Sequence, residues 1–106
     1  MLKGLYRVHF QTPLGIGAGV VYANNGELWG GDSVIAYRGS FQINGDDLTA
    51  TVKTSRHTNA LQNVFGKENV SITLSGTVNG NTVTCKGTSP EAPGVPLQAV
   101  LTKLMD

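Results

Sequence analysis

The chain has 106 residues, a length typical of one domain with a single core, and we expect one domain spanning residues 1–106. Its formal net charge is +1 and only 14% of its residues are charged, which argues against the basic surface that binds nucleic-acid backbones. No apolar run approaches the ~20 residues of a membrane-spanning helix, so we expect neither nucleic acid nor a membrane as a partner.

The first predicted element is a strand near the N-terminus, because apolar and polar residues alternate there with a period of two. Tyr6, Val8 and Phe10 fall on one face of this strand, whereas Arg7 and His9 fall on the other. We expect the face with the two aromatic rings to point toward a core.

The second predicted strand contains three glycines at alternate positions, Gly15, Gly17 and Gly19, and leads to the hairpin signal Asn25-Gly26. A phosphate-binding glycine loop would instead lead into a helix whose N-terminal amides bind the phosphate. We therefore interpret the glycines as strand residues. With no side chains on one face, this strand can bend sharply as a small barrel closes, or allow another backbone or chain to approach closely.

Two short strands are predicted between residues 28 and 43, separated by a break at Gly30-Gly31-Asp32. A turn follows at residues 44–47, and another strand begins at Leu48. Residues 55–69 form the longest interruption of the alternating pattern, and this stretch has room for a turn of helix around residues 60–64.

Three further strands are predicted at residues 70–75, 82–86 and 97–104, and residues 89–96 contain three prolines that exclude a central strand. Eight strands joined mostly by short hairpins either close into a barrel or stack as a sandwich. The successive short hairpins favour the barrel. The predicted fold class is therefore all-β, an eight-stranded up-and-down antiparallel barrel.

The sequence contains no arrangement of residues that is typical of an enzyme. His9 and His57 are the only histidines, and together with Asp32 they lack the spacing of a metal site. Cys85 is the only cysteine, so it forms no internal disulfide, and its position on an apolar face predicts a buried, inert thiol. We expect no catalytic residue, no metal and no cofactor.

The apolar faces of the strands suggest a second kind of site, a cavity inside the barrel. The interior of an eight-stranded barrel is close to the size that side chains just fill. A binding cavity for a drug-sized ligand would need a volume on the order of several hundred Å³. The candidate lining residues are Tyr6, Val8, Phe10, Tyr22, Tyr37 and Phe41; Trp29 and Phe65 are further aromatic candidates.

The sequence resembles the GrlR-like family of small negative regulators of bacterial type III secretion. The resemblance rests on Gly4-Leu5-Tyr6, on the glycine-rich second strand, on Gly30-Gly31-Asp32 and on Tyr37-Arg38-Gly39, and it extends over nearly the whole chain. It implies a lipocalin-like eight-stranded barrel that forms a homodimer. It also implies a regulator that restrains a transcriptional activator by direct protein contact.

In the founding member of this family an acidic surface loop is important for that contact. The matching turn here consists of Asn44, Gly45, Asp46 and Asp47, of which only the last two are acidic. This turn is the partner-binding loop that the resemblance implies. Because half of its residues are uncharged, the identity of the activator does not carry over.

The leading expectation is therefore a small cytoplasmic regulatory protein that acts by protein–protein contact and forms a homodimer. The cytoplasmic expectation also follows from Arg7 and His9, which interrupt the N-terminal apolar stretch that a signal peptide requires. The alternative expectation is a lipocalin-like protein that binds a small apolar ligand inside its barrel.

Overall fold

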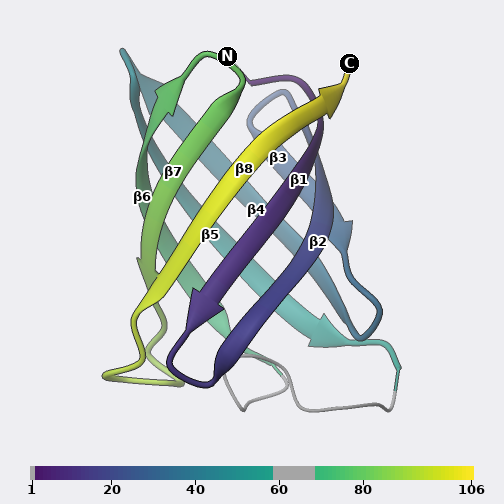
Figure 1. The fold of residues 1–106 in the computed structure, drawn as a ribbon, viewed down its shortest axis with the longest axis vertical. Helices are drawn as coiled ribbons and strands as arrows, with labels where there is room; N and C mark the ends of the chain where they lie inside the picture. The colour runs from purple at the N-terminus through teal and green to yellow at the C-terminus, as the bar shows by residue number, and fades with distance from the viewer. Residues whose placement is uncertain (1, 59–68) are drawn as a thin grey trace.

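The computed structural model describes residues 2–58 and 69–106. Its strands form one closed barrel in which each strand is hydrogen-bonded to its neighbours in the chain and the last strand pairs with the first (Figure 1). The predicted fold class is confirmed. The strands are β1 (Gly4–Thr12), β2 (Gly15–Asn24), β3 (Glu27–Gly31), β4 (Ile35–Asn44), β5 (Asp47–Arg56), β6 (Ser71–Asn79), β7 (Thr82–Thr88) and β8 (Leu97–Met105).

Short hairpin turns fix the order of the strands. Between β2 and β3, Asn25 has a φ of 51° and Gly26 a φ of 78°, the pair of positive values that a tight two-residue hairpin requires. Gly45 and Gly80 have similar positive φ values of 65° and 64° in the β4–β5 and β6–β7 turns. Each predicted hairpin signal therefore lies in a turn of the barrel.

Closure of the barrel depends on pairing between β1 and β8. Val8 is opposite Leu101 and Phe10 is opposite Ala99, and the register shifts between Leu5 and Tyr6. The two ends of the chain lie at the same end of the barrel (Figure 1). Every described strand therefore has a paired neighbour on both sides, although the short β3 pairs only with residues 20–24 of β2. A barrel of this kind offers little strand edge for edge-to-edge aggregation.

The core lies inside the barrel, because alternate residues of each strand point inward. In β7, Val83 and Cys85 are 0% and 2% exposed, whereas Thr84 and Lys86 between and after them are exposed. Burial raises the pKa of the Cys85 thiol from its ordinary value of 9.0 to about 11. At neutral pH the thiol is therefore protonated and shielded from reagents, which agrees with the expected buried cysteine.

The long interruption between β5 and β6 includes residues 59–68, so the helical turn predicted at residues 60–64 lies outside the described residues. The proline-rich segment before β8 is not a strand, as predicted, and Ser89 and Ala92 are buried within it. Across residues 2–58 and 69–106, no helix is long and apolar enough to cross a bilayer.

Candidate functional site

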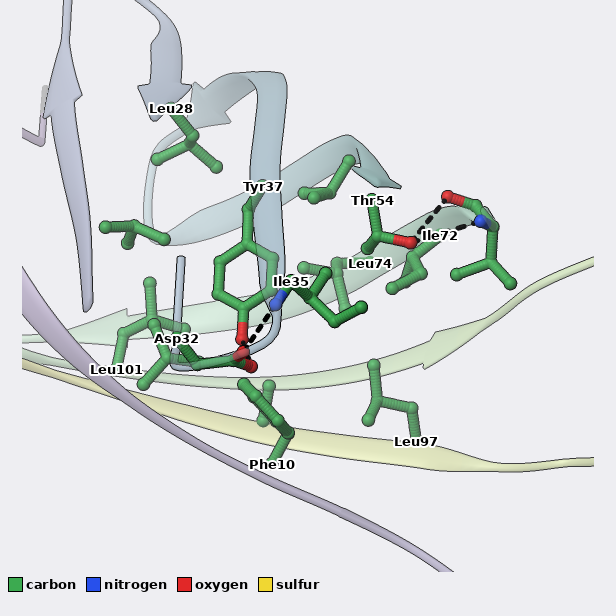
Figure 2. Close-up of a pocket in the computed structure, with 15 residues that line it drawn as sticks. Phe10, Leu28, Asp32, Ile35, Tyr37, Thr54, Ile72, Leu74, Leu97 and Leu101 are labelled. Atoms are coloured by element: carbon green, nitrogen blue, oxygen red, sulfur yellow. Dashed lines mark hydrogen bonds between the residues drawn. The ribbon is translucent and has the colours of Figure 1, made fainter. Parts of the chain in front are cut away.

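A cavity of about 90 Å³ lies inside the barrel and is partly open to solvent. It is nearer the end of the barrel where β1 and β5 finish and β4, β6 and β8 begin, because the lining residues come mostly from those parts of the strands. Asp32, Tyr37 and Thr54 are the polar lining residues, and the rest of the wall is apolar (Figure 2). The apolar lining residues are Val8, Phe10, Val21, Leu28, Ile35, Val52, Val70, Ile72, Leu74, Leu97, Ala99 and Leu101.

Three of the residues predicted to line the cavity do so, namely Val8, Phe10 and Tyr37. Tyr6 and Phe41 are buried in the core, with 3% and 5% exposure, but neither lines the cavity. Their inward orientation was predicted correctly. Their positions place them elsewhere in the barrel, where the core is packed.

Tyr22 does not line the cavity, and its predicted place was wrong. It is 36% exposed on the outer surface of β2, directly opposite Trp29 of β3, which is 39% exposed. In β2 the apolar residues alternate with glycines, and the prediction assumed that the apolar residues point inward. The glycines point inward instead, because neighbouring aromatic rings occupy the space next to them.

Gly17 and Gly19 make room for those rings. An added Cβ at Gly17 would lie 2.5 Å from the Phe10 ring, and one at Gly19 would lie 3.0 Å from the Tyr37 hydroxyl. The Phe10 and Tyr37 rings are 5.9 Å apart, centroid to centroid, at an angle of 83°, which is a favourable edge-to-face arrangement. At Gly17 and Gly19 the inward face is therefore occupied by the protein's own side chains. The carbonyl oxygen of Gly31 would lie 2.8 Å from an added Cβ at Gly19, so another part of the backbone also approaches closely there, one of the alternatives expected from the sequence.

The polar end of the cavity is built around the Asp32 carboxylate. Its Oδ1 accepts hydrogen bonds from the backbone amides of Val34 and Ile35, both at 2.8 Å, and these bonds hold the loop between β3 and β4. Its Oδ2 accepts a hydrogen bond from the hydroxyl of Tyr37, whose ring extends toward Asp32 (Figure 2). Because the carboxylate accepts hydrogen bonds both from the amides of its own loop and from Tyr37, the Asp32 side chain is held in one orientation.

Tyr37 remains a neutral hydrogen-bond donor throughout the ordinary pH range. Burial is the main cause that raises its pKa, and donation to the negatively charged Asp32 carboxylate raises it further. Because the hydroxyl has a single hydrogen and gives it to Asp32, the phenolic oxygen can act toward other molecules only as an acceptor.

The histidines do not form a metal site with Asp32. His57 follows β5, and its Nε2 donates to the backbone carbonyl oxygen of Asp32 at 2.9 Å rather than to the carboxylate. His9 is exposed on the outer face of β1, opposite Ala18. Within the part of the chain that the structure describes, there is no group of three His, Cys, Asp or Glu residues able to hold a metal ion.

The partner-binding loop expected from the sequence connects β4 and β5. Asn44, Gly45, Asp46 and Asp47 are all exposed. This turn lies at the far end of β4 and β5 from the cavity, which takes its residues from the start of β4 and the end of β5. None of the four turn residues lines the cavity.

A second surface feature was missed by the sequence analysis. The outer face of β2 has a run of apolar side chains, which one apolar residue from β1 and one from β3 extend sideways at Tyr22; these residues are here called the outer strip. Ile16 is 79% exposed and Val20 is 42% exposed. The sequence contained a signal for this strip, because the residues between the β2 glycines and the four that follow them, residues 20–23, are all apolar. The strip consists of Leu5, Ile16, Ala18, Val20, Tyr22 and Trp29.

The fold and the cavity define this chain as an up-and-down antiparallel barrel with a small apolar interior site that has one polar end. No protein-family model matches the chain, and no curated protein matches it in sequence.

Proposed function

We propose that the chain is a non-catalytic regulatory protein that acts through contacts with other proteins, as its resemblance to the GrlR-like family implies. The observation that supports this proposal most directly is the outer strip. Exposed apolar side chains that are contiguous across neighbouring strands are typical of protein interaction surfaces. Here Leu5, Tyr22 and Trp29 are opposite one another across β1, β2 and β3.

The occupant that we propose for the outer strip is a second copy of the chain. A dimer with twofold symmetry brings the same patch of both subunits together, so an apolar strip meets its own apolar counterpart. The strip carries no charged residue in its centre, and Arg7 lies beside it, opposite Val20. Flanking charge of this kind is typical of the polar rim around an apolar interface.

Sedimentation tests the dimer. Wild type is expected to sediment as a dimer, and an Ile16→Glu/Val20→Glu variant as a monomer, because the interface would have to bury two carboxylates per subunit. The matched control is Thr49→Glu/Thr51→Glu, which adds the same charges to exposed positions of β5 and should leave the dimer intact. Sedimentation of wild type as a monomer would refute the assignment.

The proposed contact with a partner protein, of the transcriptional-activator class, is the β4–β5 turn. Asp46 and Asp47 are exposed there and can meet basic side chains of a partner. This turn and the outer strip are separate, so the chain can bind a partner while it is a dimer.

An affinity pull-down from the native host tests the partner contact. Wild type is expected to retain a specific protein that an Asp46→Asn/Asp47→Asn variant loses, because the substitution removes the charge and keeps the turn. The control is Asn79→Ala/Asn81→Ala, which changes the exposed β6–β7 turn without changing charge. Equal retention by wild type and the carboxylate variant would exclude the turn as the contact, and no specific retention would remove the regulator proposal.

The cavity favours a second candidate function, binding of a small apolar molecule inside the barrel. Its volume of about 90 Å³ is below the several hundred Å³ of typical drug-sized pockets. It is also smaller than an engineered cavity of roughly 150 Å³ that binds benzene. A ring of five or six atoms would therefore fit only with part of it extending into the open side of the cavity. Titration with methylcyclopentane, followed through methyl NMR signals of the lining residues, tests this candidate.

A further inference from the structure

We propose that the cavity selects a small, mostly apolar molecule that carries one hydroxyl group and donates its hydrogen to the Tyr37–Asp32 pair. This inference rests on the second function proposed above, ligand binding inside the barrel. The apolar wall requires that most of the ligand be hydrocarbon, and the polar end determines which functional group the ligand carries.

The hydrogen bonds inside the cavity are arranged so that its polar side chains offer acceptors. The Tyr37 hydroxyl gives its single hydrogen to Asp32 Oδ2, which leaves the phenolic oxygen with an unused lone pair. An ionised Asp32 carboxylate has no hydrogen to give. A ligand that reaches this end of the cavity therefore finds a partner only if it brings a hydrogen of its own.

Thr54 does not supply the missing donor. Its Oγ1 accepts a hydrogen bond from the Val70 amide at 3.1 Å and donates its own hydrogen to the Val70 carbonyl at 3.4 Å. The hydroxyl groups of Tyr37 and Thr54 thus both donate their hydrogens to partners within the protein (Figure 2). A ketone or an ether, which can only accept, would bury its oxygen beside other acceptors and lose the hydrogen bonds it makes with water.

Three ring compounds with the same number of non-hydrogen atoms test whether the cavity prefers a ligand that donates a hydrogen bond over one that only accepts. Cyclopentanol can donate, cyclopentanone can only accept, and methylcyclopentane has no polar group. We expect the wild-type chain to bind cyclopentanol about 3- to 10-fold more tightly than cyclopentanone, the effect of one net hydrogen bond. The dissociation constants are measured by NMR titration of the full chain.

The Asp32→Asn variant is expected to remove this preference. The Asn Oδ1 can still accept from the Val34 and Ile35 amides, while its NH₂ group takes the place of Oδ2 and donates to the Tyr37 oxygen. The Tyr37 hydrogen is then free to point into the cavity and to bind the ketone. The affinity ratio of alcohol to ketone should fall to about one, whereas a Glu27→Gln control on the outside of β3 should keep the wild-type ratio.

The Tyr37→Phe variant keeps the test decisive if Asp32→Asn does not fold. Without the tyrosine hydroxyl, Asp32 Oδ2 itself becomes the acceptor, so the preference for the alcohol should persist or increase. Equal binding of alcohol and ketone to wild type would overturn the inference, as would a preference that survives unchanged in Asp32→Asn. If either result were found but methylcyclopentane still bound, the ligand-binding function would stand without the hydroxyl preference. Failure of all three compounds to bind would refute both the ligand-binding function and the hydroxyl preference.

Discussion

Replacing Gly30 with alanine is expected to destabilise the barrel by about 3–5 kcal/mol, in the range of severe single substitutions. An added Cβ at Gly30 would overlap the carbonyl oxygen of Val20 and lie 2.6 Å from the Cα of Val21. Both are backbone atoms of β2, so neither can rotate away. Relief requires that β2 and β3 separate, and β3 pairs with β2 through only five residues, Glu27–Gly31.

The matched control is Gly17→Ala in β2. Its added Cβ would meet the edge of the Phe10 ring, which lines the cavity and can turn into free space. Alanine also restricts the unfolded chain, which offsets part of the cost. We expect a loss of about 1 kcal/mol or less from this substitution. Urea unfolding of both variants measures the difference, and a Gly30→Ala protein as stable as Gly17→Ala would show that the β2–β3 contact is not tight.

The second large effect is expected from Leu101→Ala, a loss of about 3–5 kcal/mol in the free energy of unfolding. Leu101 is 7% exposed and lines the cavity, so its truncation enlarges a space that already exists. Its strand neighbours Val8 and Val83 are held in the hydrogen-bonded ladder and cannot move in to fill it. A site that cannot collapse gives the upper part of the range for such substitutions.

Val100→Ala is the control on the same strand. Val100 is 39% exposed on the outer face of β8, so its truncation leaves no cavity and should cost less than about 1 kcal/mol. Thermal or urea unfolding of the two variants compares adjacent apolar residues that occupy opposite faces of β8. A similar loss of unfolding free energy in both variants would mean that Leu101 does not point into the barrel.

The barrel could be predicted from the sequence because the signals for its strands and turns are local. Strand alternation and turns such as Asn25-Gly26 depend on residues a few positions apart, and the turn residues adopt the backbone conformation that their types favour. Val83 and Cys85 alternate with polar residues, and this pattern alone decides which face is buried.

The second strand shows where the same reasoning is insufficient. One face of β2 consists of glycines and the other of apolar residues, so polarity does not distinguish inside from outside. The choice depends on the Phe10 and Tyr37 rings, which come from β1 and β4 and need the space above Gly17 and Gly19. The cavity is equally non-local, because its volume is what remains after side chains from most of the strands have packed. The contact between Asp32 and Tyr37 depends on a loop conformation that no periodic pattern encodes.

The pairing of β1 with β8 has a consequence for how the protein is made. β1 begins at Gly4 and β8 ends at Met105, so the first strand to emerge from the ribosome must wait for the last before its second edge is paired. Until then β1 exposes one row of backbone amides and carbonyls, and β7 waits for the same partner. Closure of the barrel therefore requires the docking of β8 between β1 and β7. That step joins distant parts of the chain and is intrinsically slow.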